Sequence, residues 1–386
     1  MKNLLFKLFS GNVVVSGSSF VASIILLRSL GIDGYGQYVT LLAALTTVNS
    51  FIRLPSWQGL LKHPSADGLE NVFGLALIIE GLLGILGVVV LIILTKVLTI
   101  DVPLFFYCIP LIYFRNTTQF PLRYREKYGL YAIITSSGAI FRLFSFYILS
   151  SNSDQVGQYI LFYTLSICLE ESLFLYFSIR HIKPVFNRCG FNFMKENSRL
   201  FYSLYLNASL KSLYRGGDIL LVNYLFGNTV TGAFKLIKNS GILFQIIIDP
   251  FYQYYYRKDI VNFTIGQNWK PPINAALILL GYIGVNLLGL IILKFVYEQP
   301  SDQHVYFLVF NIGFLIQFFT IRLQGILIAQ GEDYYLSKAI LFSAVGYLLV
   351  ILISPYTSLI ILYLSWPIFY ALWTILILKR YENYLS

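Results

Sequence analysis

The sequence predicts an all-α integral membrane protein of about twelve transmembrane helices, arranged in two six-helix bundles that an internal repeat relates and that enclose a central cavity. Three observations support this fold class. Hydrophobic residues make up 57% of the 386 residues and charged residues only 12%, about half the share that soluble domains carry. Apolar stretches of about 20 residues, the length that spans a bilayer, recur from Val13 to Leu378. Motifs of the first half also return in the second, and no large catalytic domain outside the membrane is expected.

Charged residues, prolines and glycine clusters separate the individual helices. The expected spans are 12–30, 35–57, 72–95, 102–123, 129–149, 156–177, 200–226, 231–255, 273–296, 305–330, 334–353 and 358–378. They form an N-terminal six-helix bundle (1–177), a cytoplasmic connecting segment (178–199) and a C-terminal six-helix bundle (200–386). The first stretch begins like a signal peptide, but it is longer than a signal peptide's apolar region and lacks an A-x-A-like cleavage site. We therefore expect an uncleaved first helix.

The charges between the helices predict the orientation in the membrane. Lys and Arg gather in alternate connections and at both ends of the chain, whereas the opposite connections carry acidic residues such as Asp33, Asp101 and Glu298. Because short loops rich in Lys and Arg stay in the cytoplasm, both termini should be cytoplasmic, which agrees with an even number of helices. This topology explains the net charge of +10 better than a nucleic-acid surface, which needs basic residues clustered on a soluble face.

Three short matches relate the two halves of the chain. The clearest pairs Gly31 and Gly36 with Gly227 and Gly232 at one offset. The other two matches pair Pro55, Trp57 and Gln58 with Pro250, Tyr252 and Gln253, and, more loosely, Tyr124–Tyr128 with Gly331–Tyr335. Because each half holds six helices, both halves enter the membrane in the same orientation, as in a parallel repeat about an axis along the membrane normal. Two such bundles favour a transporter that works by alternating access.

The segment LLRSLGIDGYGQYVTLLAAL, the six-plus-six layout and the repeated G-x4-G turn resemble the polysaccharide flippases of the multidrug/oligosaccharidyl-lipid/polysaccharide exporter superfamily. The resemblance covers the whole chain in layout and is sharp over about Val13–Lys62. It implies transport of undecaprenyl-diphosphate-linked oligosaccharide repeat units from the cytoplasmic to the outer leaflet of a bacterial inner membrane, for O-antigen, capsule or related glycans. Membrane lipids, a glycan polymerase and chain-length machinery would be the partners of such a flippase.

Charges within the expected spans indicate where a substrate binds. A charge at mid-bilayer costs from about 2.5 kcal/mol upward, so such residues normally face a cavity or a partner. Cations, Arg142 among them, outnumber carboxylates in the spans. A lipid diphosphate needs basic surroundings, because Arg binds phosphate oxygens bidentately and Lys supplies a point charge. The cations expected to bind the diphosphate and any acidic sugars are Arg53, Lys211, Arg215, Lys235 and Lys238, with Arg115 and Arg322 of the two fourth helices in support.

Other roles are open for several of these residues. Lys211, Arg215 and Asp218 are spaced i, i+4, i+7 on one helical face, so Asp218 could simply neutralise Arg215. Arg53 lies near the cytoplasmic surface and could anchor its helix there, whereas Lys211 lies near mid-membrane and has the strongest case for a cavity role. The carboxylates could bind a coupling proton or sodium ion, or could pair with neighbouring cations. They are Glu80, Glu170, Glu171 and Asp218.

The motifs of common enzyme classes are missing from the sequence. It contains no P-loop GxxxxGK[ST] and no G-x-S-x-G, its three histidines are far apart, and its three cysteines form no CxxC. We therefore expect neither an enzyme nor a cofactor or metal site. Two alternatives stay open. One is a multidrug or cation antiporter of the same superfamily, which would prefer an acidic or apolar cavity. The other is a membrane-embedded glycan polymerase or ligase, which would expose a long outer loop.

Overall fold

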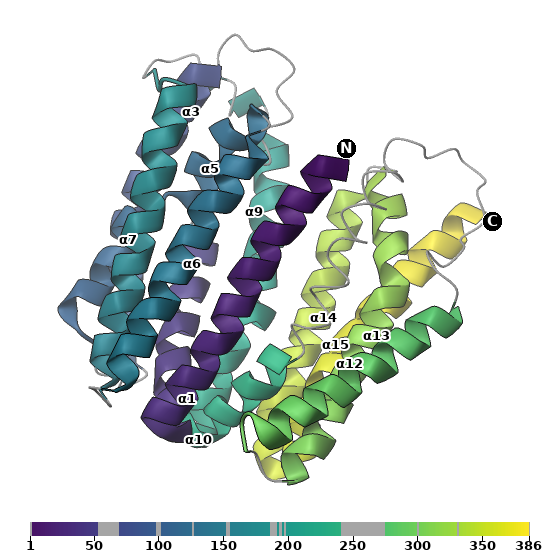
Figure 1. The fold of residues 1–386 in the computed structure, drawn as a ribbon. Coiled ribbons are helices and arrows are strands. Elements are labelled where there is room, and N and C mark those ends of the chain that lie inside the picture. Colours follow the sequence, from purple (N-terminus) through teal and green to yellow (C-terminus); the bar gives the residue numbers. More distant parts are fainter. Residues whose placement is uncertain are drawn as a thin grey trace. The chain divides into compact units, whose positions relative to one another are not determined.

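The computed structural model describes residues 2–52, 69–97, 102–125, 127–151, 155–185, 191–192, 195–196, 198–240, 275–298, 301–329 and 332–385. All regular structure in these ranges is helical (Figure 1). Six of the described helices are long and apolar enough to cross a membrane. They are Val13–Ile52, Leu69–Val97, Tyr128–Ser150, Val156–His181, Tyr334–Tyr356 and Leu359–Arg380. The prediction of an all-α multi-pass membrane protein is confirmed.

The chain divides by packing into two compact units, Met1–Leu220 and Leu221–Ser386. The connecting segment expected at 178–199 falls within the first of these units. Our expected boundary follows the internal repeat rather than the packing, and it stays a prediction.

The first unit holds seven described α-helices and two short helical turns before the start of an eighth helix. They are α1 (Lys2–Ile52), α3 (Leu69–Val97), η1 (Leu104–Cys108), α4 (Ile109–Ile112), α5 (Arg115–Tyr124), α6 (Tyr128–Ser150), α7 (Val156–His181), α9 (Ser198–Ser212), η2 (Leu213–Gly217) and the beginning of α10 (Asp218–Ser240). Helix α1 packs against α6 and α3, and α7 packs against α6 and α5. The polar contacts described below lie where α5, α6 and α7 meet.

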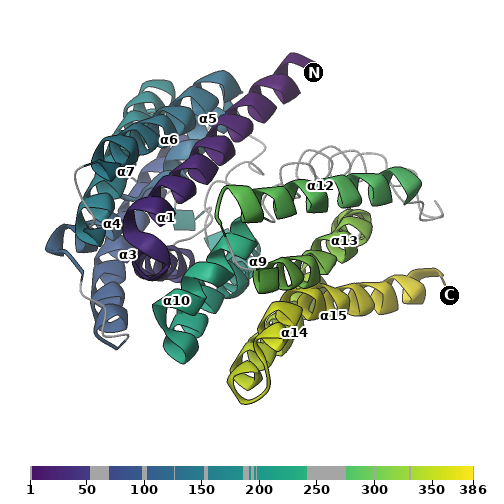
Figure 2. The ribbon, with the colours of Figure 1, turned by 60° about the horizontal axis from the view of Figure 1, so that its bottom comes forward.

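The second unit contains the rest of α10, α12 (Ala275–Phe295), α13 (Ser301–Ala329), α14 (Asp333–Ile353), η3 (Ser354–Tyr356) and α15 (Leu359–Leu385). Helix α15 packs against both α13 and α14, and α12 packs against α13 (Figure 2). Aromatic rings fill the core between these helices. Trp366 stacks on Phe310 with ring centroids 5.4 Å apart, and Tyr363 stacks on Tyr306 at 4.7 Å. Trp366 and Tyr363 are buried, so they belong to the packing of the unit.

Two glycines interrupt α1 and α10 in the same way. Gly31 has φ 67° and ψ 177°, and Gly227 has φ 78° and ψ −177°. This region of backbone space is essentially open to glycine alone, so each glycine joins two helices at a sharp turn. Figure 1 shows that the ribbon of α1 changes direction along its length. Gly31 and Gly227 are one of the two glycine pairs that the internal repeat matches, so the repeat is confirmed at this point of the backbone.

The other two matches of the repeat have different outcomes. Pro55, Trp57, Gln58 and their counterparts lie outside the described residues. In the third match, the junction between α5 and α6 resembles the junction between α13 and α14. The N–H of Lys127 donates to the Leu122 carbonyl at 2.8 Å, and the N–H of Glu332 donates to the Leu327 carbonyl at 2.9 Å. Leu122 and Leu327 are therefore equivalent, a register two residues away from the sequence match. The equivalent positions at the ends of α5 and α13 are therefore defined by these two backbone hydrogen bonds and not by the tyrosines of the sequence match.

Candidate functional site

The fourth expected helix, 102–123, is broken in the structure, and the break positions Arg115. Tyr113 leaves the helical region with φ −84° and ψ 83°, and α5 starts afresh at Arg115. The first turn of a helix carries exposed N–H groups and a partial positive charge, which disfavours a cation. Arg115 can occupy this position because two carboxylates of α7 lie beside it.

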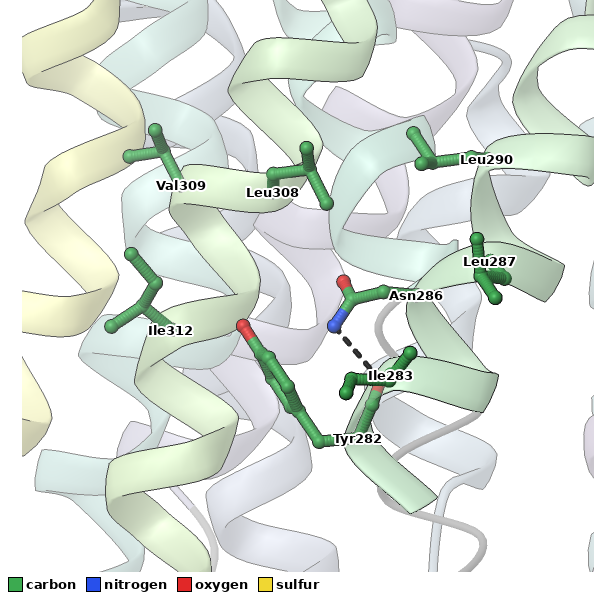
Figure 3. A pocket seen from close by; sticks show the side chains of 8 residues that line it. All are labelled: Tyr282, Ile283, Asn286, Leu287, Leu290, Leu308, Val309 and Ile312. Carbon is green, nitrogen blue, oxygen red and sulfur yellow. Dashed lines mark hydrogen bonds between the residues drawn. The ribbon is translucent and has the colours of Figure 1, made fainter. Parts of the chain in front are cut away.

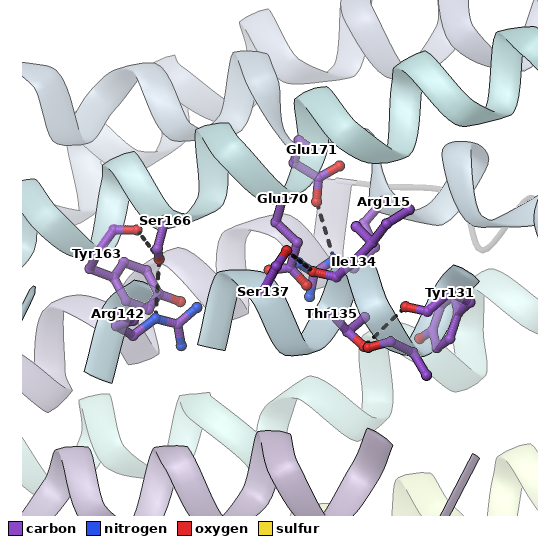
Figure 4. Close-up of polar contacts among 11 residues, drawn as sticks. Arg115, Tyr131, Ile134, Thr135, Ser137, Arg142, Tyr163, Ser166, Glu170 and Glu171 are labelled. Carbon is purple, nitrogen blue, oxygen red and sulfur yellow. Dashed lines mark hydrogen bonds and ion pairs between the residues drawn. The ribbon is translucent and has the colours of Figure 1, made fainter. Parts of the chain in front are cut away.

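Arg115 forms ion pairs with both Glu170 and Glu171 (Figure 4). Its Nη2 contacts Glu170 Oε2, and its Nε donates to Glu171 Oε1 at 3.1 Å. The arginine side chain is 25% exposed, whereas the two carboxylates are only 5% and 4% exposed. Gly138 of α6 makes room for this cluster, since a Cβ atom there would lie 2.9 Å from Glu170 Oε2. The three charged side chains form one buried network in the N-terminal unit.

A second guanidinium lies further along the same pair of helices. Arg142 of α6 donates from Nε to Ser166 Oγ at 3.1 Å, and its guanidinium carbon lies 4.5 Å from the ring centre of Tyr163. Tyr163 in turn meets Tyr38 of α1 edge-on, with ring centroids 6.4 Å apart. Figure 4 shows Arg142, Tyr163 and Ser166 together at one end of the polar contacts. Arg142 is one of the cations within the expected spans, but it is not among the residues expected to bind the substrate.

The segment around η2 packs against the end of α1. Tyr205 donates its hydroxyl to the Phe51 carbonyl at 2.5 Å, and a Cβ atom on Gly216 would lie 2.7 Å from Thr47 Oγ1. Asp218 is fully buried and accepts the N–H of Ile219 at 2.9 Å. Asp218 is therefore part of the packed first unit.

For the two cations of this segment, Lys211 and Arg215, the structure describes the backbone but not the side chain. The backbone over Leu213–Gly217 is π-helical. A π-helix has more residues per turn than an α-helix, so the α-helical spacing that puts Lys211, Arg215 and Asp218 on one face does not hold across this segment. That shared face stays a prediction.

Lys235 and Lys238 belong to α10 in the second unit. Lys238 Nζ lies 5.6 Å from the ring centre of Trp366, within cation–π range. Lys235 is half-buried.

The remaining predicted residues have other outcomes. Arg53 and the side chain of Arg322 lie outside the described residues, and Glu80 of α3 is fully buried. The structure thus brings together Arg115, Glu170 and Glu171, and the substrate-binding and ion-coupling roles of all these residues stay predictions.

A groove of about 380 Å³ lies between α12 and α13 of the second unit (Figure 3). Its lining is aliphatic apart from Tyr282 and Asn286. Asn286 donates to the Tyr282 carbonyl at 2.9 Å and accepts from Asn311 at 3.0 Å. No charged residue lines this groove, so it is not the basic site that the sequence predicts. Among the described residues, no group of three or more His, Cys, Asp or Glu side chains is placed to hold a metal ion.

Comparison with known proteins identifies the fold. No model of a known protein family and no curated protein sequence matches this chain. Solved transporter structures do match. The lipid II flippase MurJ in an inward closed conformation superposes with a TM-score of 0.69 and 14% identity, covering 96% of this chain and 87% of that one. An inward-facing multidrug resistance MATE family transporter of the MOP superfamily gives 0.63 and 11%, covering 96% and 93%.

A third solved structure also superposes on this chain. It is a MOP superfamily transporter from Pyrococcus furiosus, whose binding pocket of reverse polarity suggests, by its title, a different function. Its TM-score is 0.63 at 12% identity, over 99% of this chain and 93% of that one. At such identities the likeness shows the fold, and the fold is that of MOP superfamily transporters.

Proposed function

We propose that this chain, a multi-pass membrane protein with the fold of MOP superfamily transporters, is a flippase for undecaprenyl-diphosphate-linked oligosaccharide repeat units. It moves them across the bacterial inner membrane by alternating access, with both of its own termini in the cytoplasm. The observation that carries the proposal is the excess of basic over acidic residues within the predicted spans, in a chain with 28 Lys and Arg against 18 Asp and Glu. A diphosphate crossing the bilayer needs positive charge along its path, because hydrocarbon does not solvate it.

The proposed binding residues are the basic set from the sequence. Arg53, Lys211, Arg215, Lys235 and Lys238 attract the diphosphate and acidic sugars, and Arg115 and Arg322 support them. In this structure Arg115 is already held by Glu170 and Glu171. Binding of a phosphate at Arg115 in exchange for these carboxylates would link substrate binding to a rearrangement of the network.

The same network is our first candidate for ion coupling. One guanidinium contacts two carboxylates, so these three side chains together carry one net negative charge when both carboxylates are ionised. A proton or a sodium ion bound to Glu170 or Glu171 would cancel that charge. Glu80 and Asp218, both fully buried, are the other candidates.

A multidrug or cation antiporter is the second candidate function. The observation that favours it is the set of buried carboxylates inside the membrane, since a drug cation could bind there. One of the similar structures is also, by its title, a multidrug resistance transporter. The balance of charge favours the flippase, because Arg115 already engages two of the four carboxylates. For a glycan polymerase or ligase the support is weaker, since the similar structures reported above are transporters and a flippase by their titles.

The proposal is tested by the sidedness of lipid-linked oligosaccharide in inner-membrane vesicles from cells with and without this gene. A flippase predicts that cells without the gene accumulate complete repeat units on the cytoplasmic leaflet and make no polymer. If single repeat units instead reach the outer leaflet and stay unpolymerised there, the protein acts after flipping and the polymerase alternative holds.

A further inference from the structure

We propose that Arg142 is an oxyanion-binding residue of the N-terminal unit, which takes a phosphate or carboxylate group of the transported molecule. The inference rests on the proposed function and extends it, because the basic set expected from the sequence does not include Arg142. It is carried by the face of α6 on which Arg142 lies, by the contacts that orient its guanidinium, and by the absence of a described carboxylate beside it.

Arg142 lies on the inward face of α6. The exposed apolar residues Ile133, Ile140, Phe144 and Tyr147 mark the opposite face of this helix. At about 100° per residue, Arg142 falls about half a turn away from Ile133. The buried residues Gly138, Ser145 and Leu149 share the side of Arg142. The side chain therefore does not extend toward the lipid-facing surface, and yet it is only half-buried.

The contacts of Arg142 fix its guanidinium and leave one edge for a ligand. Ser166 donates its own hydroxyl to the Tyr163 carbonyl at 2.6 Å, so the oxygen is free to accept the Nε–H of Arg142 at 3.1 Å. The ring of Tyr163 covers the guanidinium at 4.5 Å. Because Nε is occupied, the edge formed by Nη1 and Nη2 can bind two oxygens side by side, the geometry that Arg uses for phosphate and carboxylate.

Arg142 and Arg115 differ in the carboxylates that lie beside them. Arg115 contacts two carboxylates, whereas no carboxylate of the described residues lies within ion-pair distance of Arg142. An intramembrane guanidinium is costly unless a partner or water compensates it. A competing explanation is that Arg142 only balances the surplus negative charge at Glu170, which follows Ser166 by one helical turn on α7. The two explanations differ in whether loss of Arg142 weakens anion binding.

The experiment measures ligand binding to the purified full-length protein in detergent. The probes are farnesyl diphosphate, inorganic diphosphate and an oligosaccharide that contains glucuronic acid but carries no lipid. The variants are Arg142→Gln, Arg142→Lys and Ser166→Ala, with Lys96→Gln as a control because Lys96 is an exposed cation at the end of α3. We expect Arg142→Gln to weaken binding of at least one probe by about tenfold or more.

The other variants separate binding from structural support. Arg142→Lys keeps the charge but loses the bidentate edge and should bind with intermediate affinity, and Ser166→Ala should weaken binding less than Arg142→Gln. Lys96→Gln should bind as wild type does. An effect on both diphosphates assigns Arg142 to the phosphates, and an effect on the glucuronic acid probe alone assigns it to an acidic sugar.

Two outcomes would overturn the proposal, and they can be told apart. If Arg142→Gln, or the better-tolerated Arg142→Lys, is folded and binds every probe as wild type does, Arg142 only balances charge and the proposed function stands. If the wild-type protein binds none of the three probes, the proposal and the flippase function fall together.

Discussion

At the scale of single residues, the ion-pair network of Arg115, Glu170 and Glu171 is the best-defined charged feature of the N-terminal unit. Its carboxylates are almost fully buried, and each contacts the guanidinium of Arg115. Removing one partner of a buried ion pair leaves an uncompensated charge, which costs more than the pair itself contributes.

Arg115→Gln should therefore lower the free energy of unfolding by about 3–5 kcal/mol, because two buried carboxylates lose their cation. The double variant with Glu170→Gln should recover part of this loss. Unfolding in detergent micelles measures both effects in a double-mutant cycle. Arg380→Gln is the matched control, since Arg380 pairs with Glu332 at 2.7 Å but is 35% exposed. Its loss should cost about 1 kcal/mol or less. Strictly additive effects of Arg115→Gln and Glu170→Gln would contradict the network.

Lys211→Ala should abolish transport while the protein remains inserted and abundant, because the sequence places this lysine near mid-membrane among the proposed binding cations. Transport of lipid-linked repeat units in cells, together with the amount of protein in the membrane, measures the effect. Lys96→Ala, at the end of α3, is the control and should transport normally. Full activity of Lys211→Ala would remove this residue from the site.

At the scale of the elements, Gly31 and Gly227 define the helix junctions that the two halves share. Among the described residues, and apart from the adjoining backbone, no atom lies within 4 Å of a Cβ atom built on either glycine, so a substitution there meets no steric obstacle from them. Any effect of an added methyl group must come from the backbone conformation alone.

Gly31→Ala and Gly227→Ala should each destabilise the protein by about 1–3 kcal/mol, since L-residues rarely adopt positive φ with ψ near 180°. Gly81→Ala is the control. It also meets nothing within 4 Å but lies within α3, where alanine is favoured over glycine by about 1 kcal/mol. Thermal unfolding of the three variants in one detergent compares them. Equal stability of all three would contradict the role assigned to the two junctions.

The sequence predicted most helices well because each is an apolar stretch of about 20 residues bounded by charged residues, proline or glycine, and a pattern of this length is easy to recognise. It predicted the turn at Gly31 through the repeat. It did not predict the break at Tyr113 or the π-helical turn at η2, since each involves only a few residues and leaves the apolar pattern unchanged. The start of α5 at Arg115, and with it the network, follows from that unpredicted break.

At the scale of the whole molecule, the fold class followed from the sequence, but the pairing of charges did not. Arg115 and Glu171 are 56 residues apart, and which carboxylate meets which cation depends on how α5 and α7 pack. In the same way, the inward position of Arg142 follows from which of its neighbours on α6 are exposed and which are buried. The sequence predicts a basic set of binding residues, which stays a prediction, and the structure shows the local partners of Arg115 and Lys238.

Flippase activity is tested most directly by the flipping of a fluorescent or radiolabelled polyprenyl-diphosphate-linked sugar by the purified protein in proteoliposomes. Our account predicts that the labelled lipid crosses between leaflets faster than in protein-free vesicles, and that inorganic diphosphate at high concentration slows the crossing. If the protein instead leaves this lipid in its original leaflet and exports a cationic dye such as rhodamine 6G from the same vesicles, it is a drug antiporter and the flippase account is wrong.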